Sequence, residues 1–126
     1  MSKGKLKPIL PSLKEKKRYL AIEVLSESAK FDAYEVENAV DSAVVGYIGT
    51  LGKGQAGAWM IKDSWDIESQ MGLIRLNNRY VDEVKAALTL IQKVNGKEVL
   101  FRSRGLSGIL KKAKKYIEEP LEGYER

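Results

Sequence analysis

Hydrophobic and polar residues alternate along several short stretches of the chain, and a period of two is typical of half-buried β-strands. The clearest example is residues 18–25, where one face carries Leu20, Ile22 and Val24. The opposite face carries Tyr19, Ala21, Glu23 and Leu25. Similar runs predict strands at 58–62, 72–77 and 98–103, the first two joined as a hairpin by an acidic loop.

Two longer segments have apolar residues at spacings of three and four, which predicts helices. The first begins at Asp32, because Glu35 follows three residues later as in a capping box. Its apolar stripe is Val36, Val40, Ala43, Val44, Tyr47, Ile48 and Leu51. The glycines at 49, 52, 54 and 57 are expected to end it. The second helix is predicted from Tyr80 to Lys93, before the strong turn signal Asn95-Gly96.

The resulting order is β-α-β-β-α-β followed by a C-terminal helix, and it predicts an α+β fold of the split βαβ type, ferredoxin-like or RRM-like. Two helices should cover one face of a four-stranded antiparallel sheet and leave the other face open. That open face, with Tyr19, Leu25, Leu73 and Leu100, is a candidate for protein contact. The domain organisation is a basic extended arm at 1–17, one domain at 18–118 and an acidic tail at 119–126.

The net charge of +5 conceals two strongly basic blocks. Residues 1–18 and residues 97–115 each hold seven lysines or arginines against one acid, so the remaining residues carry a net negative charge. Such concentration favours a nucleic-acid footprint over general solubility, although a solvated surface is the alternative.

The segment 101–115 places arginines, a Gly-x-x-Gly turn and a lysine-rich helix in succession, which is typical of an anion site at a helix start. Ser107 is the predicted N-cap, and Gly105 and Gly108 would let a ligand approach the backbone closely. The helix should dock through Ile109, Ala113, Tyr116 and Ile117. It should present Lys111, Lys112, Lys114 and Lys115 outward.

The composition makes catalysis by protein side chains improbable, because the chain has no histidine and no cysteine. Asp63, Asp66 and Glu68 offer carboxylates for magnesium, but solvated loop residues are the preferred interpretation. No apolar run reaches the length of a membrane span and no signal-peptide pattern follows the basic N-terminus, so a cytoplasmic protein is expected.

Five stretches together resemble the archaeal family of ribonuclease P protein component 2, and the similarity covers essentially the whole chain. These stretches are Leu10 to Val24, Gly72 to Arg75, Ala86 to Ile91, Asn95 to Arg102 and Gly105 to Gly108. The segment from Gly49 to Gly57 and the tail after Glu118 match no family motif.

The resemblance implies a subunit of the ribonucleoprotein that removes the 5′ leader from precursor tRNA, with the active site and its magnesium in the RNA. It also implies pairing with protein component 3, a homodimer within a heterotetramer as one arrangement, and only indirect contact with precursor tRNA. No cofactor bound by the protein itself is expected.

Phosphate neutralisation by cations would lower the repulsion that opposes RNA folding. The RNA-binding candidates are Lys14, Lys16, Lys17, Arg18, Arg75, Arg102, Arg104, Lys111, Lys112, Lys114 and Lys115. Because Phe101 is followed by Arg-Ser-Arg and the aromatic RNP1 pattern is absent, recognition of RNA shape and backbone is favoured over sequence-specific reading of single strands.

Two other functions use the same fold. An acylphosphatase-like enzyme would need an arginine in the loop after the first strand, and the loop Ser26-Glu-Ser-Ala-Lys30 has none. A small ligand-binding regulatory domain would not require the basic blocks.

Overall fold

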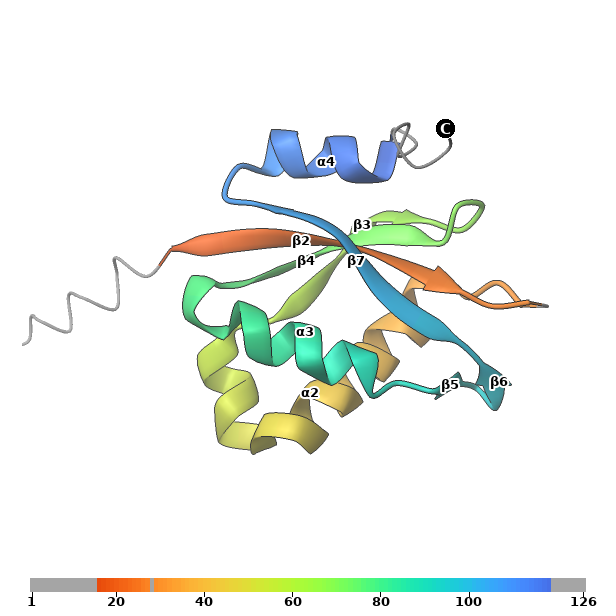
Figure 1. The fold of residues 1–126 in the computed structure, drawn as a ribbon, viewed down its shortest axis with the longest axis horizontal. Helices are drawn as coiled ribbons and strands as arrows, with labels where there is room; N and C mark the ends of the chain where they lie inside the picture. Colours follow the sequence, from red (N-terminus) through yellow and green to blue (C-terminus); the bar gives the residue numbers. More distant parts are fainter. Residues whose placement is uncertain (1–15, 28, 119–126) are drawn as a thin grey trace, which may run out of the picture.

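The computed structural model describes residues 16–27 and 29–118 (Figure 1). Its elements in chain order are β2 (Lys17–Leu25), α2 (Ala33–Ala56), β3 (Trp59–Asp66), β4 (Met71–Asn77), η1 (Asn78–Tyr80), α3 (Val81–Thr89), β5 (Lys93–Val94), β6 (Lys97–Glu98), β7 (Leu100–Ser107) and α4 (Leu110–Glu118). Most of the predicted arm and all of the predicted acidic tail lie outside the described residues.

The main sheet has the strand order β3-β4-β2-β7, and every neighbouring pair is antiparallel. The α+β fold with a β3–β4 hairpin is therefore confirmed. The last strand differs from its predicted bounds, because β7 begins at Leu100 and continues through Gly105 to Ser107. Pairing with β2 holds this extension, since Ala21 lies opposite Gly105 and Tyr19 opposite Ser107.

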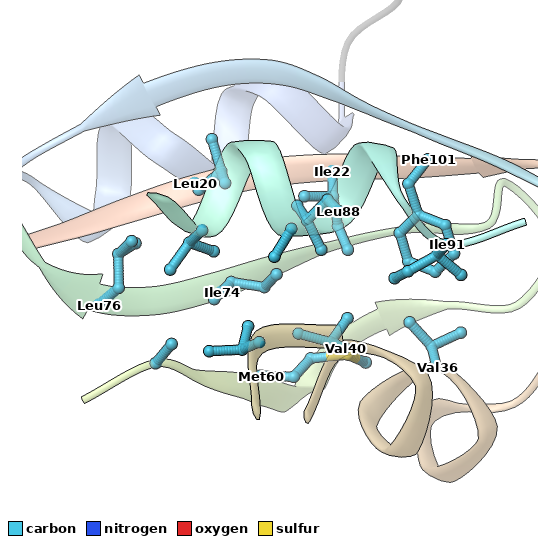
Figure 2. Close-up of a cluster of buried hydrophobic side chains, with 14 of the residues drawn as sticks. Leu20, Ile22, Val36, Val40, Met60, Ile74, Leu76, Leu88, Ile91 and Phe101 are labelled. Carbon is cyan, nitrogen blue, oxygen red and sulfur yellow. The ribbon is translucent and has the colours of Figure 1, made fainter. Parts of the chain in front are cut away.

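The main core lies between the sheet and the two helices α2 and α3, which pack on the same face (Figure 1). Figure 2 shows the side chains that meet there. They include Leu20, Ile22, Val36, Val40, Met60, Ile74, Leu76, Leu88, Ile91 and Phe101, each less than a tenth exposed. Burial of one such aliphatic side chain contributes about 1.5–3 kcal/mol, so this face holds most of the stabilising apolar contact.

The start of α2 is the predicted capping box. The Glu35 N–H donates to Asp32 Oδ1 at 2.9 Å, and the Asp32 N–H donates to Glu35 Oε1 at 2.9 Å. Of the four glycines expected to end the helix, Gly49 instead bends it, with φ 80°, and the helix then resumes as far as Ala56. Gly57, with φ 57°, ends it and donates to the Lys53 carbonyl at 3.1 Å.

The bend at Gly49 also changes what the predicted apolar stripe of α2 buries. Val36, Val40 and Val44 are buried before the bend. Leu51, which follows the bend, is 75% exposed. A residue with positive φ redirects the helix axis, so Leu51 no longer faces the core. Tyr47, which precedes the bend, is 49% exposed and does not belong to the buried stripe either.

The second predicted helix is shorter than expected, because α3 ends at Thr89. Lys93, the expected last helical residue, instead pairs with Glu98 in a small hairpin. Asn95 and Gly96 form its two-residue turn with φ 52° and 79°. Positive φ at both positions is the geometry that favours Asn-Gly, so the predicted turn is confirmed while the helix boundary is not.

The face of the sheet predicted to be open is partly covered by α4 (Figure 1). Ala113 is fully buried in a second apolar cluster with Ala21 and Leu73. Small residues at positions 21 and 113 let the helix lie close to the strands. Leu25 is only partly buried and Leu100 is 57% exposed, so this part of the predicted open face is accessible. None of the helices in residues 16–27 and 29–118 is long and apolar enough to cross a membrane.

Candidate nucleic-acid interface

The outer side of α4 is a face of cations. Lys111, Lys112, Lys114 and Lys115 are all exposed, whereas Ala113 faces the sheet. Tyr116 and Ile117 pack beside Ala113, so the predicted docking of this helix is confirmed for these three residues. Ile109 was predicted to dock with them, but it precedes the helix and is 52% exposed. We call the four lysines the lysine face.

The two basic blocks meet at one end of the sheet. Antiparallel pairing places Tyr19, near the start of β2, opposite Ser107, where β7 leads into α4 (Figure 1). The side chain of Arg18 lies beside Gly108, because a Cβ built on that glycine would lie 3.8 Å from Arg18 Cδ. Two segments that are far apart in the sequence therefore form one surface.

The end of β4 fixes the beginning of β2 in this position. The Asn78 N–H donates to the Lys16 carbonyl at 2.8 Å, and Arg18 Nη1 donates to Asn78 Oδ1 at 2.8 Å. Lys17 Nζ donates to Asn77 Oδ1. Arg18 Nε is buried and has no hydrogen-bond partner among the described residues. Lys14 lies outside the described residues, while Lys16 is exposed.

The Gly-x-x-Gly segment differs from the predicted ligand cradle at Gly105, whereas Gly108 is exposed. Gly105 belongs to β7 and lies under the Tyr116 ring, so its backbone is covered by the protein itself and not open to a ligand. The helix starts at Leu110, and Ser107 Oγ accepts the Ile109 N–H at 3.0 Å, one position before it. Ser107 therefore stabilises the turn that precedes α4 and is not the N-cap residue itself.

The two arginines of β7 have different surroundings. Arg102 is half exposed and donates to Glu23 Oε1 through Nε at 3.0 Å and Nη2 at 2.9 Å. The Arg104 side chain is only 4% exposed, and it donates to Glu23 Oε1 at 3.1 Å and to the Tyr116 carbonyl at 2.7 Å. Arg102 keeps an accessible guanidinium, whereas Arg104 ties α4 to the sheet.

Glu23 is the residue that the sequence interpretation missed at this site. It stands between Arg102 and Arg104 on the face that α4 covers. Alternation along residues 18–25 already assigned it to the face opposite the core-facing Ile22, and the spacing Arg-x-Arg puts both arginines on one side of their strand. What the sequence lacks is the register that pairs Glu23 with Arg102.

Arg75 lies apart from the lysine face, in the middle of the sheet surface that carries α4. It is partly exposed, and its Cζ lies 5.7 Å from the centroid of the Trp59 ring. Arg75 lies opposite Trp59 of β3 on one side and opposite Tyr19 of β2 on the other. The structure thus brings together Lys16, Lys17, Arg18 and the start of α4, and places Arg75 on the same face as that helix.

Two of the three acidic candidates for magnesium, Asp66 and Glu68, already have partners in the protein. Asp66 accepts the Glu68 N–H at 3.0 Å and the Ser69 hydroxyl at 3.0 Å, while Glu68 pairs with Lys30 at 3.3 Å. Within residues 16–27 and 29–118, no group of three or more histidine, cysteine or acidic side chains could hold a metal ion.

The loop after β2, where an acylphosphatase-like enzyme would bind phosphate, places an acid, Glu27, beside a hollow. It lines a hollow of about 410 Å³ together with the start of β7, and Glu27 and Glu98 contribute its charged groups. Carboxylates repel phosphate, so this end of the molecule does not support phosphate chemistry.

The electrostatics of α4 favour an anion at its start. The N-terminus of a helix carries partial positive charge, and lysines in the first turn add to it unfavourably. Lys111 and Lys112 occupy this turn, which follows the Gly108 backbone beside Arg18. Phosphate groups would relieve the repulsion and could bridge the two basic blocks.

Known proteins and one protein family are similar to this chain in sequence or in fold. A family model described as the Rpp14/Pop5 family matches residues 18–118. Ribonuclease P protein component 2 of Thermococcus kodakarensis is 38% identical over 116 residues, covering 91% of this chain and 94% of the relative. The protein of the same name from Methanobrevibacter smithii is 32% identical over 121 residues, covering 91% and 99%. A chain in the cryo-EM structure of yeast ribonuclease MRP shares the fold, with TM-score 0.60 and 12% identity over 88% of this chain and 92% of that chain.

Proposed function

Because the chain belongs to the Rpp14/Pop5 family, as a protein subunit of ribonuclease P, we propose that it binds the phosphate backbone of the enzyme's RNA. The observation that carries the proposal is the lysine face of α4, which is exposed beside the start of β2. Both basic blocks of the sequence contribute to this one surface, so a folded RNA could contact them simultaneously.

The physical role is charge neutralisation. A large RNA must bring its phosphates together to form magnesium sites, and their mutual repulsion opposes this. Each lysine or arginine that contacts a phosphate releases counterions and lowers the repulsion. The candidates that remain accessible among the described residues are Lys16, Lys17, Arg18, Arg75, Arg102 and the lysine face.

Cleavage belongs to the ribonuclease P holoenzyme, which is an endoribonuclease. We place the active site and its magnesium in the RNA subunit. The full sequence supports this division, since it has no histidine for general base catalysis and no cysteine nucleophile. The chain's own contribution would be to hold the RNA in its active conformation, with precursor tRNA contacted only indirectly.

The proposal includes protein partners. The family resemblance implies pairing with protein component 3, and a second copy of this chain within a heterotetramer. Exposed apolar side chains such as Tyr47, Leu51 and Leu100 are available for such contacts on surfaces distant from the lysine face. The cytoplasmic location expected from the sequence stays a prediction.

Reconstitution of precursor-tRNA cleavage tests the proposal. Ribonuclease P RNA would be assayed across a magnesium series, alone and with the full chain together with protein component 3. The expected result is activity at a lower magnesium concentration when the chain is present and not when component 3 is added alone. An unchanged magnesium dependence would overturn the proposed role.

A further inference from the structure

Three residues form a row across the sheet next to the start of α4. Tyr19 of β2 lies opposite Arg75 of β4, and Arg75 lies opposite Trp59 of β3. Side chains directly opposite one another in antiparallel strands project from the same face. This face is the one that carries α4, because Tyr19 packs in the cluster around Ala113.

The outer end of this row is open. Tyr19 is partly buried under α4, but Trp59 on the edge strand is 47% exposed and belongs to neither apolar cluster of the described residues. The second tryptophan differs, because Trp65 packs against the core and its Nε1 donates to the Phe31 carbonyl at 2.9 Å. Packing thus accounts for Trp65 and not for Trp59.

The guanidinium of Arg75 lies over the Trp59 ring. Its Cζ lies 5.7 Å from the ring centroid, within the range of a cation–π contact. An aromatic and a cationic planar group therefore lie over one another, with the Trp59 ring 47% exposed and Arg75 partly exposed. Aromatic rings and arginine planes are the groups on which proteins stack unpaired bases, and such stacking tolerates any base.

The surrounding charge favours a polyanion over a protein side chain. Neither the row itself nor the adjacent pair of Lys17 and Asn77 contains a carboxylate. The lysine face begins at the same end of the sheet, since β7 enters α4 beside Tyr19 (Figure 1). A base held on the row would thus have cations near the phosphates on either side of it.

We propose that Trp59 and Arg75 form a stacking site for one unpaired nucleobase of an RNA whose backbone follows the lysine face. The inference rests on the proposed function, because it assumes that this surface binds RNA. It adds a base contact to a surface otherwise explained by phosphate contacts alone. The site reads no sequence, because every base has an aromatic face.

Trp59 fluorescence tests the contact directly, because the chain has only two tryptophans. The full-length Trp65→Phe variant reports from Trp59 alone, and Trp59→Phe reports from Trp65 alone. Each would be titrated at low salt with a 12-nucleotide single-stranded RNA and with a 12-base-pair RNA duplex. We expect strong quenching of Trp59 by the single strand, weak quenching by the duplex, and no quenching of Trp65. Equal signals from both tryptophans would overturn the stacking site.

Affinity for the single strand provides a second measurement, which does not require the Trp65→Phe variant to fold. Trp59→Leu should weaken binding about tenfold, whereas Trp59→Tyr should retain it within about threefold. The matched control is Tyr47→Leu, since Tyr47 is an aromatic residue of similar exposure, 49%, on α2. Equal affinity of Trp59→Leu and the parent would overturn the proposal.

The outcomes separate this inference from the proposed function. If the parent protein binds ribonuclease P RNA with a steep salt dependence but Trp59→Leu binds equally well, the stacking site is wrong and the phosphate contacts stand. If Trp59→Leu instead loses only its association with purified component 3 or with itself, the row is a protein contact and the inference is also wrong. Absence of any RNA binding by the parent would overturn both.

Discussion

The Tyr116 ring of α4 lies directly over Gly105 of β7. A Cβ built on this glycine would come within 2.6 Å of three ring carbons, which is closer than real atoms approach. The backbone of Tyr116 is fixed in this position, because its carbonyl accepts a hydrogen bond from Arg104 at 2.7 Å. Glycine at position 105 is therefore required for α4 to seat on the sheet.

Gly105→Ala should destabilise the protein by about 1–3 kcal/mol, the range of overpacking in a closely packed contact. Gly108→Ala is the control, because the nearest atom to its Cβ would lie 3.8 Å away. Chemical denaturation of both variants measures the difference. In a protein that already carries Tyr116→Ala, Gly105→Ala should cost less stability than it costs in the parent. Equal stability of the two glycine variants would contradict this account.

The strands and their faces were predictable because a period of two specifies them locally. Leu20 and Ile22 are buried as the alternation of residues 18–25 indicated. The position of α4 was harder, since its docking depends on Gly105, Ala21 and Ala113 meeting across three separate segments. Small residues have no period that identifies them as contacts.

The bend within α2 was not predicted, because the sequence does not show what each glycine does. A glycine can end a helix, bend it or be tolerated within it, and the sequence does not distinguish these cases. Gly49 bends α2, Gly57 ends it, and Gly52 lies inside it. At the candidate interface, the charges were visible in the sequence, but the burial of Arg104 depends on the register of β7 against β2.

Gln70 is a buried polar residue that the sequence interpretation did not single out. It is 6% exposed and has φ 57° at the turn between β3 and β4. Its side chain accepts the Phe31 N–H at 2.9 Å and donates to the Phe31 and Ile67 carbonyls at 3.1 and 2.7 Å. It thereby attaches the turn to the segment that precedes α2.

Gln70→Ala should cost about 2–3 kcal/mol, because the buried Phe31 N–H would lose its partner. Ser69→Ala is a neighbouring control, since Ser69 bonds only to exposed Asp66 at 3.0 Å and its loss should cost less than about 1 kcal/mol. Urea denaturation of both variants provides the measurement. A loss at Gln70 no larger than that at Ser69 would show that its hydrogen bonds are readily replaced by water.

Alanine substitutions of Arg102 and Arg104 should separate the effect on RNA binding from the effect on stability. Arg104→Ala removes a buried cation that bonds Glu23 and the Tyr116 carbonyl, so we expect a loss of about 3 kcal/mol in unfolding free energy. Arg102→Ala removes a half-exposed partner of the same carboxylate and should cost less than about 1 kcal/mol.

The RNA affinities of these two variants should follow a different pattern. Arg102→Ala should weaken binding to ribonuclease P RNA although the protein is folded, because its guanidinium is accessible to phosphate. Arg104→Ala should bind normally at temperatures where circular dichroism shows the native fold. Filter binding at several temperatures makes this comparison, and a binding defect in folded Arg104→Ala would assign that residue a direct contact.

The lysine face should determine how strongly RNA affinity depends on salt. Replacing Lys111, Lys112, Lys114 and Lys115 by alanine removes four exposed cations that have no partner among the described residues. Each lost phosphate contact lowers the slope of log affinity against log salt by about 0.7–0.9, so the slope should fall by about 3 if all four contact RNA. Unfolding free energy should change little, because Ala113, Tyr116 and Ile117 still dock α4.

A second quadruple variant controls for net charge. Alanines at Lys30, Lys85, Lys93 and Lys97 remove the same charge from exposed positions outside α4 and the start of β2. If binding depended only on overall charge, the two variants would lose the same slope. We expect the second variant to lose less than about one third as much, because Debye screening confines each lysine to phosphates within about 8–10 Å. Equal slopes would mean that the lysine face is an ordinary solvated surface.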